Sequence, residues 1–303
     1  MLSDELTGSV RERLGPVGVW LGSLRPATAD AERRAARRVE ELGYGSLWTG
    51  ELIGGKEAFA HQSLLLSATE RIITGTGIAN AWARHPATME GGGATLGAAY
   101  PGRFILGVGI SHAHIVGRSG QDYQRPLARM VEYLDGMDLA TAYGPRHEVP
   151  VPRVLAALRP QMLALARDRA DGAHPYFVPP SHTPIARAVL GTGKLLVPEQ
   201  AVVVATESTV ARRRARDHME VYLQSPNYVN NLKQLGYTDE DFSEGGSDRL
   251  VDAIVAWGGV DAIARRVREH LDAGADHVLL QPLGDLAQAL EQLEVLAPAV
   301  LGG

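Results

Sequence analysis

The stretch that decides the fold is Ile72-Ile73-Thr74-Gly75-Thr76-Gly77-Ile78, a short run of β-branched and small residues. A helical pattern follows it over residues 86–99, and a second short apolar run, Phe104-Ile105-Leu106-Gly107-Val108, comes next. A strand, a helix and a further strand in this order predict a βαβ unit with parallel strands.

The same alternation continues in both directions along the chain. Further short apolar runs lie at residues 17–21, 46–48, 154–157, 171–174, 201–205 and 277–281. Helical patterns lie between them, at residues 30–42, 126–139, 160–169 and 260–273. Eight strands, each followed by a helix over about 250 residues, are typical of a closed barrel. The sequence therefore predicts the α/β class, as a (β/α)8 TIM barrel in which residues 1–303 form a single domain.

An open, doubly wound sheet is the structural alternative. Such a sheet usually carries a glycine-rich phosphate loop after its first strand, and here that strand runs into Leu21-Gly22-Ser23-Leu24-Arg25-Pro26. The segment Gly107-Val108-Gly109-Ile110-Ser111-His112 has two of the three fingerprint glycines, but it follows the fourth strand and lacks the third glycine. The barrel is the better interpretation.

One segment is longer than a barrel unit. Residues 207–257 are rich in helix-forming and polar residues, and we expect a helical excursion after the seventh strand, over the barrel mouth or at an oligomer contact. Gly43 and Gly274 directly follow the first and last predicted helices, where glycine suits a left-handed C-cap.

Composition narrows the classes of function. The 303 residues carry a net charge of -5, which gives no reason to expect a nucleic acid or an anionic membrane as partner. The chain has no cysteine, which excludes disulfides, thiolate catalysis and cysteine-bound metals. No apolar run approaches the roughly 18 residues of a membrane span, and the first sixteen residues do not resemble a secretory signal. We expect a cytoplasmic protein.

In a barrel of this kind, functional residues gather in the loops that follow the strands. The His112-Ala113-His114 pair there is of a type that metal-dependent barrel hydrolases use, but those enzymes place it after the first strand and need an aspartate after the eighth. Here the eighth strand ends in Leu280-Gln281-Pro282. We therefore predict no metal site, and a metal-dependent hydrolase is the disfavoured third alternative.

Small residues end the third and fourth strands. Gly77, Ala79, Gly107 and Gly109 either mark strands that taper into turns or let the backbone approach a flat ligand closely, since glycine has no Cβ. The residues alone leave both interpretations open.

Several longer motifs resemble one superfamily over nearly the whole chain. The segment Gly43-Tyr44-Gly45-Ser46-Leu47-Trp48-Thr49-Gly50-Glu51 is similar to the second-strand signature of the bacterial luciferase-like flavin-dependent oxidoreductases. Thr76-Gly77-Ile78-Ala79-Asn80 with His85-Pro86 resembles their third-strand bulge, and residues 100–109 resemble their most recognisable segment. Residues 82–84, 111–113, 152–158 and 225–228 further resemble an actinobacterial subgroup regarded as dependent on the deazaflavin coenzyme F420.

This resemblance implies where a cofactor would lie. Its ring is expected in the barrel mouth against Gly77-Ile78, where relatives carry a non-proline cis peptide. Glu51 matches the acidic position near the pyrimidine edge of the ring, and residues 156–159 match a segment along the ribityl and phosphate side. The expected cofactor-binding residues are Glu51, Gly77, Ile78, Ala79, Asn80, Gly109, Ser111, His112, Ala156, Ala157, Leu158, Arg159, His174 and Tyr176.

Other residues are assigned to substrate and to proton transfer. Trp20, Trp82 and Tyr176 are expected to form apolar walls of a substrate site, which suggests an uncharged or weakly polar substrate. Several deazaflavin dehydrogenases carry a histidine directly after the acidic residue of the second strand, and here that position is Leu52. A proton must then come from His112, His85 or His174, because imidazole titrates near neutral pH. We take His112, Glu51 and His85 as the catalytic candidates.

The sequence thus predicts an oxidoreductase that transfers a hydride between coenzyme F420 and a small organic substrate. One alternative is an FMN-dependent monooxygenase of the same superfamily that uses reduced flavin and oxygen. The other is a flavin-binding protein without turnover, which the absence of a histidine at Leu52 permits. Relatives commonly dimerise, so a homodimer is expected.

Overall fold

The computed structural model describes residues 2–145 and 148–302. Eight parallel staves form a barrel, and each stave is either one strand or two short strands that follow each other in line. Neighbouring strands follow one another around the barrel in the order β9, β11, β1, β2, β3, β5, β6, β7 and β8, and β4 pairs with β5 beside β3. The strands are β1 (Val17–Trp20), β2 (Ser46–Thr49), β3 (Ile73–Thr76), β4 (Ala79–Asn80), β5 (Phe104–Gly109), β6 (Arg153–Leu155), β7 (Gly172–Ala173), β8 (Leu195–Leu196), β9 (Glu199–Val204) and β11 (Val278–Pro282).

The barrel closes within one continuous piece of chain. Leu195 and Leu196 of β8 pair with β7, and three residues later Glu199 of β9 pairs with Leu279 of β11. β8 and β9 are therefore two halves of the seventh stave. The sequence predicts this stave only at residues 201–205, because Pro198 interrupts the apolar run that precedes them.

The third stave is also in two halves. β3 and β4 both pair with β5, and the peptide between Gly77 and Ile78 that separates them is cis. The cis peptide expected from the family resemblance is confirmed. The predicted continuous strand at residues 72–78 is corrected to two short strands on either side of this bulge.

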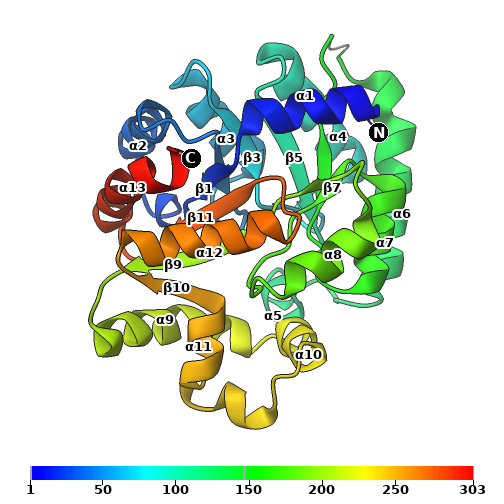
Figure 1. Cartoon of the computed structure of the whole chain (residues 1–303). Coiled ribbons are helices and arrows are strands. Elements are labelled where there is room, and N and C mark those ends of the chain that lie inside the picture. Colours follow the sequence, from blue (N-terminus) through cyan, green and yellow to red (C-terminus); the bar gives the residue numbers. More distant parts are fainter. Residues whose placement is uncertain (1, 146–147, 303) are drawn as a thin grey trace.

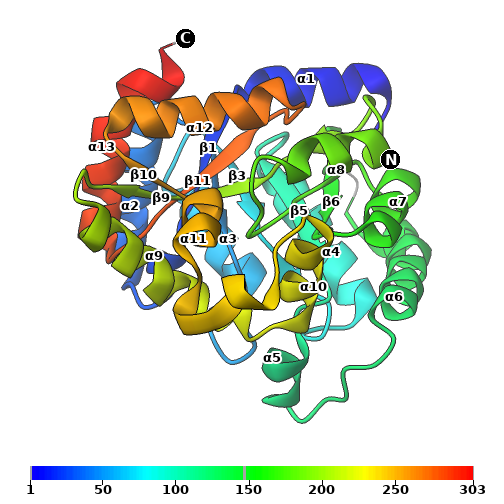
Figure 2. The same cartoon turned by 60° about the horizontal axis from the view of Figure 1, so that its bottom comes forward.

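Helices cover the outside of the barrel and both of its ends (Figures 1 and 2). The left-handed conformations of Gly43 (φ 89°) and Gly274 (φ 102°) confirm the two predicted C-caps. The α-helices are α1 (Asp4–Leu14), α2 (Ala29–Glu41), α3 (Ala58–Ser67), α4 (Pro86–Ala99), α5 (Ala113–Gly117), α6 (Pro126–Ala140), α7 (Pro160–Arg169), α8 (His182–Leu190), α9 (Ser208–Leu223), α10 (Pro226–Gln234), α11 (Asp248–Ile254), α12 (Val260–Asp272) and α13 (Leu286–Leu301). The 3-10 helices are η1 (Gly22–Leu24), η2 (Thr141–Tyr143) and η3 (Asp239–Gly245).

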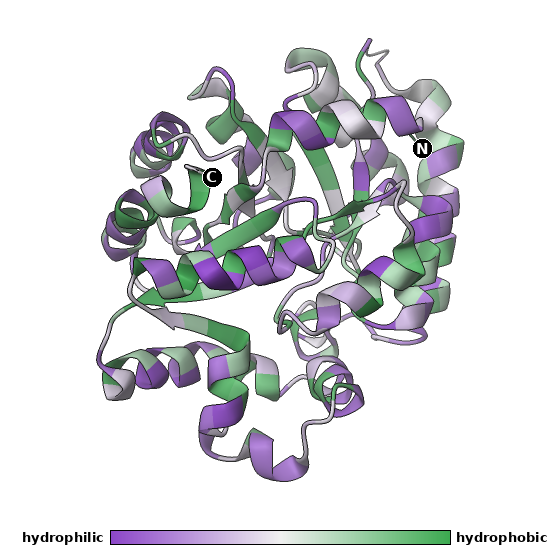
Figure 3. Ribbon diagram, in the orientation of Figure 1, coloured by the Kyte–Doolittle hydropathy of each residue, from purple (hydrophilic) through white to green (hydrophobic). Residues whose placement is uncertain are grey.

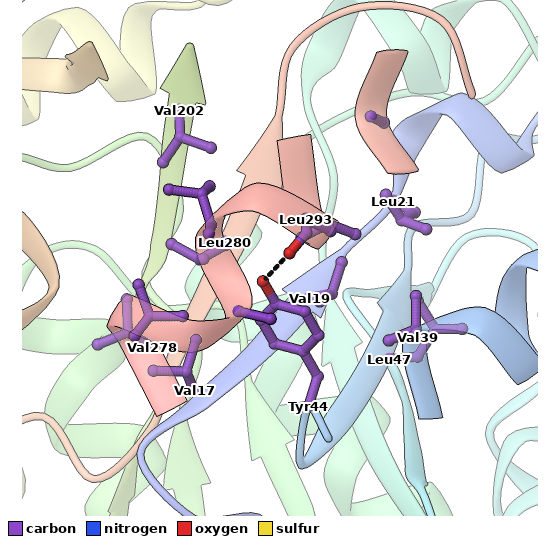
Figure 4. Packing of buried hydrophobic residues seen from close by; sticks show 14 of the residues in the cluster. Val17, Val19, Leu21, Val39, Tyr44, Leu47, Val202, Val278, Leu280 and Leu293 are labelled. Atoms are coloured by element: carbon purple, nitrogen blue, oxygen red, sulfur yellow. Dashed lines mark hydrogen bonds between the residues drawn. The ribbon is translucent and has the colours of Figure 1, made fainter. Parts of the chain in front are cut away.

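The largest apolar layer lies between the staves and the outer helices. Val17, Val19 and Leu47 point outward from β1 and β2 and pack with Val39 of α2 and Leu293 of α13 (Figure 4). The Tyr44 hydroxyl, buried in the same layer, donates to the Leu293 carbonyl at 2.9 Å. Colouring by hydropathy shows the same separation of polar and apolar residues. The outer helices carry many purple, hydrophilic residues, and the strands are mostly green and hydrophobic (Figure 3).

The two ends of the barrel are covered by different segments. α1 lies at the end where the strands begin, and its Leu14 is fully buried among the inward side chains of the staves. α9, α10, η3 and α11 lie at the opposite end (Figure 2). These elements are the predicted excursion, and they cover the mouth.

Several elements have no range in the prediction, among them α1, α3, α5, α8 and α13. Another is β10 (Val255–Gly258), which ends the excursion by pairing with Ala201–Val204 of β9 outside the ring of staves. Among the described residues, no helix combines the length and the apolar character needed to cross a membrane.

Candidate active site

A cavity of about 420 Å³ opens where the staves end. Barrel residues and excursion residues line it together, so the excursion completes its wall. The lining residues are Trp20, Arg25, Gly50, Glu51, Leu52, Gly77, Ile78, Ile110, Ser111, His112, Ile115, Tyr123, Pro126, Leu127, Ala156, Ala157, Leu158, Arg159, Pro160, Gln161, Met162, His174, Tyr176, Tyr222, Asn227, Tyr228 and Gln234.

Most residues that the sequence assigns to cofactor or substrate meet at this cavity. Those lining it are Trp20, Glu51, Gly77, Ile78, Ser111, His112, Ala156, Ala157, Leu158, Arg159, His174 and Tyr176. The structure places Ala79, Asn80, Trp82, His85 and Gly109 outside the lining.

The glycines that end the third and fourth staves make room for protein atoms. A Cβ on Gly109 would lie 2.4 Å from Ile78, and one on Gly107 would lie 2.0 Å from the Thr76 carbonyl oxygen. A Cβ on Gly77 would lie 2.5 Å from the indole nitrogen of Trp20, which donates to the Gly77 carbonyl at 2.9 Å. The absent Cβ atoms therefore allow the staves to pack tightly around the bulge, and of these glycines only Gly77 faces the cavity.

Glu51 is held by donors on every side. Its carboxylate accepts from the backbone N–H of Ala58 (3.1 Å) and of Asn80 (2.7 Å), and it pairs with both terminal nitrogens of Arg84. Four hydrogen bonds fill the acceptor capacity of a carboxylate. Glu51 thus fixes the bulge and the start of α3 at the cavity edge, and a role as proton donor or base does not fit this arrangement.

His85 and Trp82 do not reach the cavity. His85 is the exposed N-cap of α4, and its Nδ1 accepts from the Ala87 N–H at 3.2 Å. Trp82 lies behind the cavity wall, where its indole donates to the Ile110 carbonyl and its ring packs on Tyr123. The histidine directly before Pro86 caps a helix, and the structure places it outside the cavity lining.

His112 faces the cavity at the N-cap of α5. Its ring lies 4.9 Å from that of Tyr228 and 6.0 Å from that of His114. Burial, helped by the nearby His114, lowers the pKa of His112 to about 4. His112 is therefore a neutral imidazole at pH 7, whereas the sequence alone suggested an ordinary value near neutrality. No group of three or more metal-ligating side chains gathers in the part of the chain that the structure describes.

His174 lies at the bottom of the cavity with one nitrogen unused. It is 1% exposed, and its Nδ1 lies 2.7 Å from the Val197 carbonyl, which can only accept. Burial lowers the pKa of His174 to about 4, so the ring is neutral and Nε2 carries a lone pair. This Nε2 has no partner among the described residues and lies next to Gly77. His174 presents a buried acceptor that a ligand could satisfy.

The excursion supplies tyrosines that the sequence prediction does not include. Tyr222 of α9 and Tyr228 of α10 line the cavity and pack around Phe177. The Tyr222 hydroxyl lies 2.7 Å from that of Tyr176, which in turn donates to the Gln281 side chain at 2.8 Å. Because these contacts join residues 46 to 105 positions apart in sequence, no local pattern indicates them.

The chain after the fifth stave turns at the cavity into α7. Arg159 is the N-cap residue, its side chain makes no capping bond, and Pro160, Gln161 and Met162 of the first turn line the cavity. Pro160 has no N–H, and the N–H of Met162 already donates to the Arg159 carbonyl at 3.0 Å. The corner therefore offers an anion the positive end of the helix dipole and the Arg159 guanidinium. This corner can hold a phosphate or a carboxylate.

Comparisons with known proteins agree with this arrangement. A Mycobacterium tuberculosis protein, whose name places it provisionally among the coenzyme F420-dependent oxidoreductases, is 29% identical over 195 residues, 54% of this chain and 55% of that protein. The chain thus matches about half the length of that relative.

Two solved structures share the fold. An F420-dependent secondary alcohol dehydrogenase, solved with an F420–acetone adduct, superposes with a TM-score of 0.76 at 17% identity, over 94% of this chain and 99% of that one. The oxygenating part of a Pseudomonas putida Baeyer–Villiger monooxygenase, solved with FMN, has a TM-score of 0.67 at 14% identity, over 94% and 97% of the two chains. The family model of the luciferase-like monooxygenases matches residues 14–277, and the chain belongs to that family.

Proposed function

We propose that this protein is an oxidoreductase that moves a hydride between coenzyme F420 and a small organic substrate in the cavity at the barrel mouth. Similarity to other proteins is the first support, because the relative and the dehydrogenase named above are described as F420-dependent and the monooxygenase was solved with FMN. When bound, the deazaflavin supplies or accepts the hydride, and the protein supplies orientation, an enclosed pocket and a proton path.

The observation that carries the proposal is the unpartnered Nε2 of His174. A buried acceptor without a partner costs about 1–3 kcal/mol, and this one lies beside the Gly77–Ile78 peptide at the bottom of the cavity. The pyrimidine edge of a deazaflavin carries N–H groups that would satisfy it. Trp20 and Tyr176, whose rings lie 5.4 Å apart, form an aromatic wall of the same region.

The anionic end of the cofactor fits the corner at α7. Arg159 and the first turn of α7 line the cavity there, and the guanidinium with the positive end of the helix dipole matches a phosphate group in charge. Ala156 and Ala157 precede this corner and leave space for the chain that joins ring and phosphate.

The proton that accompanies the hydride is assigned to His112. Its ring faces the cavity, and as a neutral imidazole it can take the proton from a substrate hydroxyl during oxidation and return it during reduction. Tyr228, whose ring centre lies 4.9 Å from that of His112, lines the cavity beside it. Glu51 acts as a positioning residue through its bonds to Asn80 and Arg84.

Turnover with the reduced cofactor tests the proposal. Under anaerobic conditions, reduced F420 is mixed with the protein and a panel of small aldehydes, ketones and enones, and its oxidation is followed by absorbance. We expect oxidation that needs both the protein and an organic acceptor. Product formed only with reduced FMN and oxygen would instead identify an FMN-dependent monooxygenase. We also propose the homodimer, which sedimentation analysis of the purified protein measures.

A further inference from the structure

We propose that the substrate carries a carboxylate or a similar anionic group, and that Arg25 is the residue that receives it. This inference rests on the proposed function, because it takes the cavity as a shared site for cofactor and substrate. It revises the expectation of an uncharged substrate that the apolar walls suggest.

The charges that line the cavity are few. Glu51, Arg25 and Arg159 are the ionised side chains among its lining residues, and Glu51 is already neutralised by Arg84. Within residues 2–145 and 148–302, no carboxylate forms an ion pair with Arg25 or Arg159, and no hydrogen-bond acceptor contacts either guanidinium. The cavity therefore offers two cations without a counter-charge.

The two arginines lie on opposite sides of the mouth. Arg25 follows β1, the first stave, and Arg159 follows β6, the fifth of eight. Staves one and five face each other across a closed eight-stave barrel. A cofactor whose phosphate lies at α7 would pair with Arg159. Arg25 would then remain to bind a second anion, on the opposite side of the place proposed for the cofactor ring.

The loop that carries Arg25 is built to hold it in place. Lys56 donates to the carbonyls of Leu24 (2.8 Å) and Ala27 (2.6 Å), on either side of Arg25, and forms an ion pair with the fully buried Glu32. A lysine reaching from the loop after β2 thus fixes the turn after β1. Such preorganisation reduces the entropy that is lost when an arginine binds a ligand.

The guanidinium of Arg25 has protein neighbours on two sides. The Arg25 guanidinium lies 5.4 Å from the ring of Trp20, and a side chain on Gly50 would approach one of its nitrogens to 3.3 Å. It therefore lies between an aromatic wall and a position kept free by glycine, at the solvent-exposed rim of the cavity. A planar guanidinium favours a carboxylate, which it binds through two parallel hydrogen bonds.

Small aromatic ligands of similar shape but different charge test whether Arg25 binds an anion. The F420-loaded protein is titrated with benzoate, phenyl phosphate and the neutral benzamide, and the affinities are measured by calorimetry. We expect benzoate to bind at least tenfold more tightly than benzamide, since hydrogen bonds between two charged groups are stronger than those to a neutral amide. A preference for phenyl phosphate over benzoate would assign the site to phosphorylated substrates. Equal affinity for benzoate and benzamide, repeated with the acetate–acetamide pair, would overturn the proposal.

Matched variants separate the two arginines. R25Q should lose the preference for benzoate by about tenfold or more and leave the affinity for F420 within twofold, whereas R159Q should weaken F420 binding and preserve the benzoate preference. R25K, which keeps the charge but not the paired hydrogen bonds, should lie between R25Q and the natural protein. A tenfold loss of F420 affinity in R25Q would give Arg25 to the cofactor and contradict the proposal.

These titrations also show whether the proposed function and the anion site fail independently of each other. If the protein binds no F420, the proposed function fails, and the benzoate and benzamide titrations are repeated on the cofactor-free protein. Binding of benzoate that depends on Arg25 would then still support the anion site.

Discussion

Arg84 and Glu51 form a two-pronged ion pair whose side chains are 7% and 4% exposed, at the edge of the cavity. Both terminal nitrogens of Arg84 contact the carboxylate, so the pair ties the loop after β4 to the loop after β2. Its hydrogen bonds raise the pKa of Arg84 despite the opposing effect of burial.

Removing one partner of this pair should be costly. R84A leaves the buried Glu51 carboxylate uncompensated, and we expect a loss of about 3–5 kcal/mol in the free energy of unfolding. Urea denaturation measures it. The double variant E51Q/R84M, which removes both charges, should recover much of the loss, and a double variant as unstable as R84A would show that the ion pair itself is not the cause.

Glu199 gives a prediction for pH dependence. It is 2% exposed inside the barrel, accepts a hydrogen bond from the Phe177 N–H at 3.1 Å, and burial raises its pKa to about 8 from the ordinary 4.5. Between these two values the unfolded chain has lost the proton that the folded chain keeps, so this residue makes stability fall as pH rises from about 4.5 to 8.

E199Q isolates this effect, because glutamine is neutral at every pH and keeps an oxygen for the Phe177 N–H. The unfolding free energy of the natural protein, relative to E199Q, should decrease across this range and stay level above it. A difference that does not change with pH would mean that Glu199 ionises normally in the folded protein.

The two histidines that the sequence ranks together should behave differently. H112A removes an imidazole that faces the cavity, and we expect turnover to fall by about a hundredfold or more with a much smaller change in cofactor affinity. H85A removes an exposed helix cap and should cost about 1 kcal/mol of stability or less without slowing turnover. Steady-state kinetics of both variants decide this, and equal rates for H112A and the natural protein would remove His112 from the mechanism.

Gly109 should tolerate no side chain. In G109A the new Cβ would meet Ile78 at 2.4 Å, and we expect destabilisation of about 1–3 kcal/mol from overpacking beside the bulge. G117A is the matched control, since no atom lies within 4 Å of the Cβ it would add. Thermal unfolding should show a lower midpoint for G109A alone. Equal midpoints would mean that the staves around Gly77–Ile78 adjust without strain.

Periodicity and family motifs predict much of this molecule, and the limits of that prediction are physical. The βαβ unit around residues 72–108 and the caps at Gly43 and Gly274 follow from local patterns, because strand alternation and C-cap geometry are encoded by neighbouring residues. The excursion is visible as a segment too long for one barrel unit. Its tyrosines, however, reach the cavity only through contacts with distant staves.

Glu51 and His85 are types of residue that catalyse reactions, and a sequence shows their surroundings to different extents. The partner of Glu51 is Arg84, 33 positions away, and only the folded chain brings the two together. The partner of His85 is the Ala87 N–H two positions on, so this cap is a local pattern that the proline after the histidine indicates. The lowered pKa of His112 comes from burial, which a sequence pattern does not measure.

The most direct test of the central claim is the affinity of the purified protein for the two cofactors, measured side by side. Fluorescence titration with F420 and with FMN is done on the natural protein and on the H174F variant. We predict that F420 binds at least tenfold more tightly than FMN and that H174F weakens F420 binding by about tenfold, because the buried acceptor beside Gly77 is lost. Tight binding of FMN with none of F420 would contradict the account.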